Sequence, residues 1–491
     1  MKLTSLIQTL NEYRVTGPAD CDICSICQDS RQVKEGSLFA ALPGTETDGH
    51  LFVRNAVLGK AAAILYQRGC LKDTGIVEEY KETVAFIEVP DSRQALGTVA
   101  AVWYNHPSEK ITLVGITGTN GKTTTATLLY RLFNRMGLKS GLLSTIANYV
   151  GDSQEPTSLT TPDVLTIHAL LSKMVTCGCT FCFMEVSSHA IDQQRIAGLR
   201  FAGGIFTNLT QDHLDYHKTF AAYRDTKKAF FDSLPPEAFS LVNGDDRNGQ
   251  IMIQNSRSQK FTYACKRMAN FTARVLEQNA EGMHLVIDGI QVWSPLIGMH
   301  NAYNLLSVYA CARLLNQPAD EILRILSSLK TVSGRMEYVK GGNNLTAVVD
   351  FAHTPDALQN ALTTLRALLT PGQQLICVVG CGGNRDQSKR PLMAQIADKY
   401  ADLCIFTSDN PRHEDPEVIL DHMFAGLSAE ARERNLRITD RYQAIKTAVK
   451  TANKGAIILV AGKGHETYQD TKGVKNPFDD KAILTQLLKT G

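Results

Sequence analysis

Apolar residues along the chain follow two different periods, and the switch between them predicts the secondary structure. Residues 111–116, ITLVGI, form a short apolar run that ends at a glycine-rich stretch, which is typical of a buried strand. Apolar positions from Ala126 to Met136 then recur at helical spacing, and Gly137 is expected to end that helix. Similar short apolar runs predict strands at Phe181–Val186, Gly204–Thr207, Ala347–Asp350, Leu375–Val379, Leu403–Thr407 and Ala456–Val460.

Helical stretches separate these strands, which is the pattern of parallel sheets with helices on both faces. We therefore expect an α/β protein with a central parallel-sheet domain and a second doubly wound domain after it. Residues 1–108 mix short strands and helices, and the sequence Asn-His-Pro-Ser at 105–108 reads as a linker. The predicted division is 1–108, 109–333 and 334–491.

Composition and charge suit a globular enzyme. Of 491 residues, 44% are hydrophobic and 20% charged, which is ordinary for a chain that builds a large core. The formal net charge of +2 gives no reason to expect nucleic acid or a membrane surface as a partner. No apolar run approaches transmembrane length, and residues 1–11 are too polar for a signal peptide, so we expect a cytoplasmic protein without membrane insertion.

Twelve cysteines leave two interpretations open. The first cluster has the spacing C-x-x-C-x-x-C, but Arg31 stands where an iron–sulfur run would need its fourth cysteine. The second cluster lacks a matching pair at zinc spacing. Buried structural cysteine is therefore favoured over a metal-binding redox protein with a nucleotide switch. The clusters are Cys21, Cys24 and Cys27, and Cys177, Cys179 and Cys182.

The sequence GITGTNGKTTT at 115–125 sits between the first strand and helix, where a phosphate loop belongs. Its glycines are closer together than in the common G-x-x-x-x-G-K-[ST] pattern. Gly118 and Gly121 permit close backbone approach, and Lys122 adds positive charge. A plain strand-to-helix turn is the alternative, although such a turn does not need Lys-Thr at the helix start.

Polar residues follow the next two strands, as ligand sites at the carboxyl ends of parallel strands require. MEVSSH places Glu185 and Ser187 at one strand end, and TNLTQDHLDYH places a cluster that includes His213 and His217 at the other. The two histidines are four residues apart but lack the glutamate of H-E-x-x-H, which disfavours a zinc protease. Mg²⁺ coordination beside the phosphate loop is favoured over a polar turn that caps a helix.

The motifs taken together resemble the Mur ligases of peptidoglycan synthesis, over the whole chain and in the family's order. Folylpolyglutamate synthase shares the central fold but is not expected to carry both SDNPR and GCGGNRD. The motifs are GTNGKTT, MEVSSH, TNLTQDHLDYH, YRDTKKAFF, GMHNAYN, SGRME, DFAHTPDAL, GCGGNRDQSKRPLM, SDNPR and VAGKGHE.

This resemblance implies a three-domain ligase. The first domain would bind a UDP-sugar peptide, the second ATP and the third an amino acid. ATP would phosphorylate the side-chain carboxylate of D-Glu in UDP-MurNAc-L-Ala-D-Glu, and an amine would displace the phosphate. A monomer is expected, with one Mg²⁺ near Thr123 and Glu185. A second Mg²⁺ would use His213 and Lys227, the latter carbamylated by CO₂. A solvated Lys227 is the alternative, and Lys228 beside it makes the choice depend on the family register.

The resemblance also assigns residues to each ligand, with Lys122, Glu185, His213 and Lys227 as the catalytic set. ATP is assigned Gly118, Thr119, Asn120, Gly121, Lys122, Thr123, Thr124, Asn301, Arg335 and Asp350. The UDP-sugar dipeptide is assigned Gln28, Ser30, Thr45, Glu46, Thr47, Thr160, Thr161, Ser187, Gln193 and Arg195. Leu159 departs from some relatives, which carry Asn there. The amino acid is assigned Arg385, Asp409, Asn410, Pro411, Arg412, Gly462 and Glu466.

The stretch Asp-Asn-Pro-Arg at 409–412 matches the form found in members that add meso-diaminopimelate. That amino acid is lysine with an extra carboxylate, which a guanidinium binds through two hydrogen bonds. A surface arginine after a turn is the alternative for Arg412, and lysine addition is the alternative activity. Meso-diaminopimelate is therefore the expected third substrate.

Overall fold

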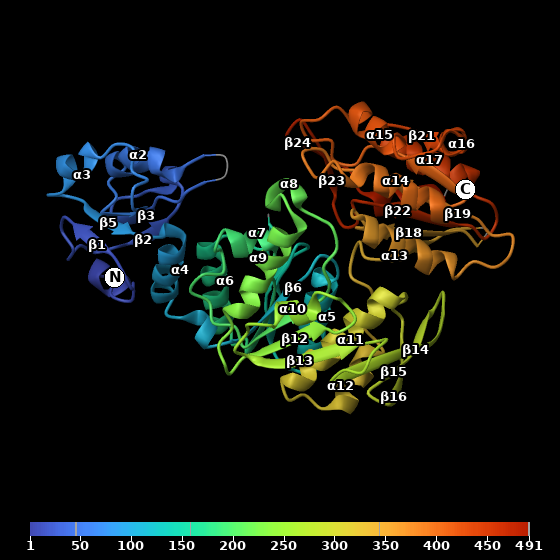
Figure 1. The fold of residues 1–491 in the computed structure, drawn as a ribbon, viewed down its shortest axis with the longest axis horizontal. Coiled ribbons are helices and arrows are strands. Elements are labelled where there is room, and N and C mark those ends of the chain that lie inside the picture. The colour runs from blue at the N-terminus through green and yellow to red at the C-terminus, as the bar shows by residue number, and fades with distance from the viewer. Residues whose placement is uncertain (45–46, 158, 343, 490–491) are drawn as a thin grey trace. The chain divides into compact units, whose positions relative to one another are not determined.

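The computed structural model describes residues 1–44, 47–157, 159–342 and 344–489 (Figure 1). Contacts between residues divide the chain into two compact units. Unit 1 comprises Met1–Gly115, Gly137–Gly204 and Ser233–Ala238, and unit 2 comprises Ile116–Met136, Ile205–Asp232 and Phe239–Gly491. Strands β6 (Thr112–Thr117) and β11 (Gly203–Phe206) each contribute residues to both units. None of the helices in the described residues has the length and apolar character needed to cross a membrane.

The first body of unit 1 is a five-stranded sheet of order β1-β5-β4-β3-β2, in which only β1 runs antiparallel to its neighbour. Apolar side chains fill both faces: Leu38 and Ile87 pack with α1 and α4, and Phe39 and Phe86 face α2 and α3. The elements are α1 (Leu3–Ile7), β1 (Arg14–Thr16), β2 (Ser25–Cys27), η1 (Ser30–Gln32), β3 (Ser37–Ala40), η2 (Gly49–Phe52), α2 (Val53–Leu58), β4 (Ala63–Gln67), α3 (Gly75–Tyr80), β5 (Ala85–Val89) and α4 (Ser92–Trp103).

The second body of unit 1 follows the short 3-10 helix η3 (Pro107–Glu109), which overlaps the last two residues of the predicted linker at 105–108. Its strands follow the order β10-β7-β8-β9, with β10 parallel to β7 and the last two pairs antiparallel. The elements are β7 (Ser140–Leu143), β8 (Asn148–Val150), β9 (Ser153–Glu155), α6 (Val164–Thr176), β10 (Phe181–Glu185) and α7 (Ser188–Asp192).

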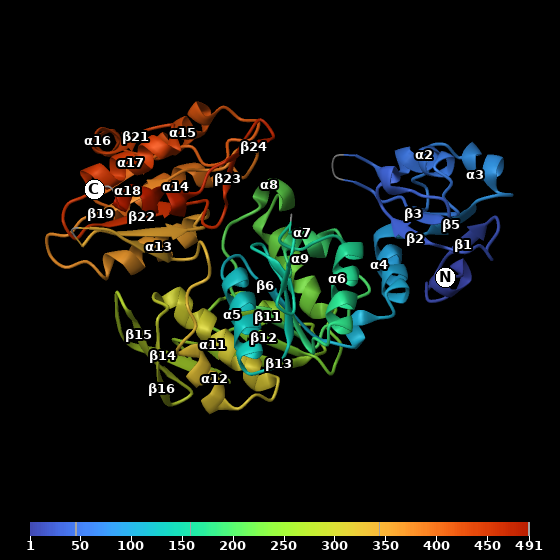
Figure 2. The same ribbon diagram turned by 180° about the vertical axis from the view of Figure 1, so that it is seen from behind.

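One sheet region of unit 2 has the strand order β16-β15-β14-β13-β12-β11. Within it, β12 pairs in parallel with β13, and β13 pairs in parallel with β14. Helix α11 lies against β14 and helix α12 against β16 (Figure 2). The elements are α5 (Lys122–Arg135), α8 (Leu214–His217), α9 (Phe220–Asp232), β12 (Phe239–Asn243), α10 (Gly249–Met252), β13 (Gln259–Ala264), β14 (Phe271–Asn279), β15 (Gly282–Ile287), β16 (Ile290–Ser294), α11 (Met299–Leu314) and α12 (Ala319–Leu326).

The antiparallel meander β14-β15-β16 is an addition to the strand–helix pattern that the sequence predicted. Asp288 and Gly289 join β15 to β16 with φ values of 46° and 83°. Two successive positive φ values are those of the tight hairpin turn for which Asp-Gly is a strong signal. That dipeptide was therefore the sequence feature that could have revealed the hairpin.

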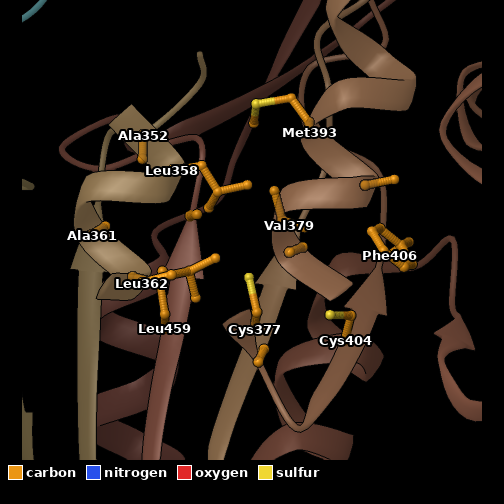
Figure 3. Close-up of a cluster of buried hydrophobic side chains, with 14 of the residues drawn as sticks. Ala352, Leu358, Ala361, Leu362, Cys377, Val379, Met393, Cys404, Phe406 and Leu459 are labelled. Carbon is orange, nitrogen blue, oxygen red and sulfur yellow. The ribbon is translucent and has the colours of Figure 1, made fainter. Parts of the chain in front are cut away.

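The rest of unit 2 carries a sheet of order β17-β18-β22-β19-β20-β21, parallel except for β17. Figure 3 shows Leu358 and Leu362 of α13 and Met393 of α14 facing Cys377, Val379, Phe406 and Leu459 of the strands. The elements are β17 (Glu337–Lys340), β18 (Thr346–Asp350), α13 (Pro355–Arg366), β19 (Leu375–Val379), α14 (Lys389–Tyr400), β20 (Leu403–Phe406), α15 (Pro416–Phe424), α16 (Ala429–Arg434), β21 (Leu436–Arg437), α17 (Arg441–Thr451), β22 (Ile457–Ala461), β23 (Tyr468–Thr471), β24 (Val474–Pro477) and α18 (Asp480–Lys489).

The α/β fold class is confirmed, and each strand expected from a continuous apolar run is present within one residue at either end. These runs were predictable because a strand covered on both faces needs apolar side chains at every position. The helix predicted from Ala126 onward begins earlier, at Lys122, because its first turn is the phosphate loop itself.

Within unit 1, helix α4 of the first body packs directly on the segment that follows α7. A Cβ built on Gly97 would lie 2.4 Å from the Cβ of Ala197, and one on Gly198 would lie 2.2 Å from the carbonyl oxygen of Gly97. Gln194 also donates to Asp91, the N-cap of α4, at 2.6 Å. Glycine at 97 is therefore required by close backbone approach.

We predict that Gly97→Val destabilises the protein by about 1–3 kcal/mol or more, because the added atoms have no space. Denaturant unfolding of the purified variant measures this. Gly75→Ala is the matched control, since its Cβ would meet only Asp73 Oδ1 at 3.6 Å, an ordinary contact. Equal stability of the two variants would contradict the close-packing argument.

Candidate functional site

The loop between β6 and α5 has a backbone that only glycine allows at two positions. Gly118 has φ 147° and Gly121 has φ 86°. A Cβ on Gly118 would lie 1.9 Å from Thr207 Oγ1, and one on Gly121 would lie 2.6 Å from Asn304 Oδ1. Helix α5 starts at Lys122, so the backbone N–H groups of its first turn, which have no acceptor within the helix, lie next to this loop. The arrangement is that of a phosphate-binding helix N-terminus.

Residues after β11 hold this loop in place. Asn208 accepts from the backbone N–H of Asn120 at 2.9 Å, and Thr207 Oγ1 donates to the carbonyl of Asn120 at 2.6 Å. Thr119 donates to the carbonyl of Thr210 at 3.1 Å. The loop's polar groups on this side are therefore satisfied by protein, which fixes its shape before any ligand binds.

A cavity of about 340 Å³ opens beside the loop in unit 2 and is within the size range of small-molecule sites. The residues predicted for ATP that line it are Asn120, Gly121, Thr124, Asn301, Arg335 and Asp350. The sequence analysis missed other lining residues, among them Asp245, His300, Tyr303, Asn304, Asp356 and Asn360. Asp356 lies within the DFAHTPDAL motif but was not assigned to ATP, whereas Asn360 lies outside every motif. Both come from α13 and reach the cavity through tertiary packing.

Arg335 and Asp350 meet beside the start of α5. The Arg335 guanidinium donates to Thr123 Oγ1 at 3.2 Å and lies 4.5 Å from the centre of the Phe351 ring. Asp350 accepts from the backbone N–H of Met336 at 2.7 Å. Burial raises the pKa of Asp350 to about 6, although the Arg335 charge opposes the rise.

The structure distinguishes the two neighbouring lysines of α9. Lys227 is buried and its ammonium donates to the carbonyl of Gly118 at 3.0 Å. Lys228 instead pairs with Asp232 at 2.6 Å, one turn along the same helix. Burial, together with the charge of Lys122, lowers the pKa of Lys227 well below its ordinary value, with Asp212 opposing the fall. Only Lys227 therefore lies against the phosphate loop.

Tyr223, which the sequence analysis did not single out, joins Lys227 to His213. Its ring lies 4.8 Å from Lys227 Nζ and its centre 6.1 Å from that of the His213 ring. Its hydroxyl is 3.1 Å from Thr119 Oγ1. Lys227 and His213, predicted as ligands of one metal, thus border the same buried aromatic side chain beside the loop.

Asp212 belongs to the TNLTQDHLDYH cluster that the sequence predicted as a source of oxygen and imidazole ligands. It is 6% exposed, and its carboxylate lies 3.6 Å from Lys389 Nζ, 3.8 Å from His353 Nε2 and 3.4 Å from His213 Nε2. Burial alone would raise its pKa, but these three neighbours hold the pKa of Asp212 well below its usual range. One carboxylate therefore joins the central and C-terminal parts of unit 2.

Within the described residues, no three His, Cys, Asp or Glu side chains are arranged to hold a metal ion. Mg²⁺ commonly takes one or two protein ligands and completes its shell with substrate phosphates. The Thr123 hydroxyl at the loop suits that pattern.

The cysteines of the first cluster have separate surroundings. Cys24 donates to the carbonyl of Glu35 at 3.0 Å, and Cys27 lies 3.9 Å from the carbonyl of Leu38. Burial raises the pKa of the Cys27 thiol to about 11, which disfavours the thiolate that binds metal. In the second cluster Cys182 is buried in β10.

Unit 1 contains its own cavity, of about 380 Å³. Four residues predicted for the UDP-sugar dipeptide line it: Gln28, Thr47, Gln193 and Arg195. Leu159, the departure from some relatives, lines it as well. Ser30 begins η1 and is not among the lining residues, while Thr45 and Glu46 fall outside the described residues.

The remaining predicted residues of unit 1 form one hydrogen-bonded group at the end of β10. Glu185 is buried and accepts from the backbone N–H of Thr145 at 2.8 Å. Thr161 donates to the carbonyl of Glu185 at 2.8 Å, and its Oγ1 lies 3.3 Å from Ser187 Oγ. Thr160 accepts from Thr145 Oγ1 at 3.0 Å. The Arg195 guanidinium donates to the carbonyl of Thr161 at 2.9 Å, which connects this group to the cavity.

In unit 2, the loops after β20 and β22 bring the predicted amino-acid residues together. Asn410 Nδ2 donates to Glu466 Oε2 at 2.7 Å. A Cβ on Gly462, where φ is 114°, would lie 2.4 Å from Asp409 Oδ2. Pro411 is buried. Strands β20 and β22, which run parallel to β19 on either side of it, thus place their carboxyl ends, and the charged residues that follow them, at one edge of the sheet.

Arg412 is held by its backbone as well as its side chain. It has φ 50°, its N–H donates to the carbonyl of Asp470 at 2.9 Å, and Nη1 donates to the carbonyl of Gly383 at 2.7 Å. Partial burial and the like charge of Arg412 lower the pKa of Arg385. Two arginines close enough to repel each other form a place where a carboxylate is stabilised.

Comparison with known proteins gives the same family for all three regions. Models for "Mur ligase family, catalytic domain", "Mur ligase middle domain" and "Mur ligase, glutamate ligase domain" match residues 22–104, 116–312 and 334–464.

Two curated relatives carry the name UDP-N-acetylmuramoyl-L-alanyl-D-glutamate--2,6-diaminopimelate ligase. The protein of Parabacteroides distasonis is 50% identical over 490 residues, covering 100% of this chain and 99% of its own. That of Cytophaga hutchinsonii is 48% identical over 492 residues with the same coverage. A solved structure described by the same name is 30% identical, covers 99% of this chain and 98% of its own, and superposes with a TM-score of 0.68. The chain belongs to the Mur ligase family.

Proposed function

We propose that the protein joins meso-diaminopimelate to the side-chain carboxylate of D-Glu in UDP-MurNAc-L-Ala-D-Glu, with ATP converted to ADP and phosphate, in peptidoglycan synthesis. The observation that carries the proposal is the pairing, within unit 2, of a phosphate loop with a site that holds both Glu466 and Arg412. The relatives named for this reaction support it.

The reaction brings a carboxylate and the phosphates of ATP together, so the protein must stabilise their negative charge. A carboxylate is a poor electrophile, so its oxygen first attacks the γ-phosphorus of ATP and ADP leaves. The amine then attacks the acyl carbon, loses a proton, and phosphate leaves with the former carboxylate oxygen. Lys122 and the backbone N–H groups of α5 stabilise the phosphoryl charge as it moves. Mg²⁺, where bound, would add positive charge at the transferring phosphate, with Thr123 and Glu185 as proposed ligands.

Lys227 is proposed to carry a carbamate formed with CO₂. Carbamylation requires the neutral amine, whose lone pair attacks the carbon of CO₂ while a proton is released. The lowered pKa of the buried Lys227 raises the fraction of the side chain that is the neutral amine. The product is an anionic oxygen donor, which with His213 would hold a second Mg²⁺.

The other assignments complete the proposal. Residues 1–108 bind the UDP sugar, residues 109–333 bind ATP and residues 334–491 bind the amino acid. The enzyme acts as a monomer in the cytoplasm, where its nucleotide-linked substrates are made. An ATP-dependent ligation assay that offers each candidate amino acid tests the proposal as a whole, and a wild-type enzyme that incorporates no meso-diaminopimelate would overturn it.

For the phosphate loop, we predict that Lys122→Ala lowers kcat/KM by roughly two to three orders of magnitude or more, because the loop loses the cation that faces the phosphates. The substitution should leave the fold intact, since Lys122 is the first residue of α5 and is only partly buried. Lys330→Ala, which removes an exposed lysine of the same unit, should be neutral. Near-wild-type turnover of Lys122→Ala would count against a phosphate cradle.

For the carbamate, we predict that Lys227→Ala is nearly inactive and that added short-chain carboxylic acids partly restore it by supplying the missing carboxylate. Lys228→Ala is the matched control, because it removes the neighbouring lysine that pairs with Asp232. Steady-state rates with and without acid measure both variants. Full activity of Lys227→Ala without added acid would show that no carbamate is needed.

For the amino acid, we predict that wild-type enzyme favours meso-diaminopimelate over L-lysine by roughly 30-fold to several thousand-fold in kcat/KM, because lysine leaves the Arg412 charge without its partner. Arg412→Ala should lose activity through a higher KM for meso-diaminopimelate, with little change in KM for ATP. It need not gain lysine activity. Comparable wild-type values for the two amino acids would show that Arg412 does not read the distal carboxylate.

A further inference from the structure

Lys463, which the proposed mechanism does not use, is a buried cation inside the amino-acid site. It lies between two glycines with positive φ, Gly462 at 114° and Gly464 at 54°. A Cβ on Gly464 would lie 2.7 Å from the carbonyl oxygen of Gly334. The two glycines let the chain pass this close to its neighbours, while the side chain of Lys463 is 0% exposed.

The ammonium of Lys463 contacts residues of both loops that form the site. It donates to Asn410 Oδ1 at 2.9 Å and to Glu466 Oε2 at 3.1 Å, and lies 5.5 Å from the centre of the Tyr468 ring. Asn410 follows β20 and Glu466 follows β22, so this one side chain joins the ends of two strands. A bond from a charged donor is stronger than one between neutral groups.

The orientation of the Asn410 amide follows from these contacts. Its oxygen accepts from Lys463 Nζ and also from the backbone N–H of Asp470 at 3.0 Å. Its nitrogen must then face Glu466, to which it donates at 2.7 Å. Without Lys463, the amide would lose one of the two donors that define which way it points.

The charge of Lys463 also acts on Glu466. Burial and the nearby carboxylate of Asp409 raise the pKa of Glu466, while Lys463 and Asn410 oppose the rise. A carboxylate that becomes neutral no longer attracts an ammonium group. The lysine therefore favours the form of Glu466 that can bind an amino group.

We propose that Lys463 is a positioning residue for the amino-acid substrate, because it holds Asn410 and Glu466 in the arrangement that receives the substrate's ammonium group. This inference rests on the proposed function. It gives the lysine a role through Glu466 and Asn410 rather than at the reacting atoms, so its loss should weaken amino-acid binding and spare the other two substrates.

The test is the full-length enzyme with Lys463→Met, which keeps the length of the apolar stem and removes the charge. We expect KM for meso-diaminopimelate to rise roughly tenfold to several hundredfold, while KM for ATP and for UDP-MurNAc-L-Ala-D-Glu stays within about twofold. A second readout is the ratio of Kd values for the dipeptide nucleotide and the tripeptide product. That ratio isolates the amino-acid site, and it should shift against the tripeptide by a similar factor.

Lys475→Met is the matched control. Its ammonium lies 4.5 Å from the centre of the same Tyr468 ring, but the residue is exposed and outside the hydrogen-bond network. Its KM values should match wild type. If Lys463→Met fails to fold, Lys463→Gln replaces it, because the amide retains a donor without the charge, and the same split between substrates is expected.

A folded Lys463 variant with an unchanged KM for meso-diaminopimelate would overturn the inference, as would equal rises in all three KM values. Either result leaves the proposed function standing, provided that wild-type enzyme ligates meso-diaminopimelate. A wild-type enzyme without that activity would overturn both.

Discussion

The close approach of the loop Gly118–Gly121 to the end of β11 is the constraint on which the candidate phosphate site depends. No side chain fits at Gly118, because Thr207 occupies the space that a Cβ would need. Thr207 and Asn208 then satisfy the loop's polar groups, and Lys227 adds its bond to the carbonyl of Gly118. The loop is therefore fixed in a shape that presents the start of α5 to a phosphate, without reorganisation on binding.

Buried charges recur at the strand ends of unit 2, and each is paired. Asp212 faces three cationic or imidazole groups, Lys463 joins Asn410 to Glu466, and Arg441 pairs with Asp480 at 2.7 Å with both side chains 0% exposed. The Arg441 guanidinium also donates to the carbonyl of Ala461, at the end of β22. Such pairs contribute little net stability, since desolvation offsets their attraction, but removing one partner is costly. Their value here is to hold the loops that follow β20 and β22 in one arrangement.

The surroundings of a charged side chain also explain why the neighbouring lysines Lys227 and Lys228 differ in their contacts. Lys227 and Lys228 are adjacent in sequence, and helical geometry turns them to different faces of α9. One meets the buried carbonyl of the loop and the other meets Asp232. Their different environments, rather than their side-chain chemistry, make one a candidate for carbamylation and leave the other in a partly buried ion pair.

The sequence by itself determined the α/β class, the buried strands and the phosphate loop, because each depends on residues close together in the chain. Continuous apolar runs specify strands covered on both faces, and Gly118, Gly121 and Lys122 carry the loop's requirements locally. The resemblance of ten short motifs then indicated the family. Only the tertiary structure decided which lysine faces the loop, that Tyr223 lies between Lys227 and His213, and that Asp356 reaches the cavity. It also brought Lys463 to Asn410, 53 positions apart in sequence. These contacts depend on how strands and helices that are distant in sequence pack together. A local sequence pattern does not specify which side chains will meet in the folded protein.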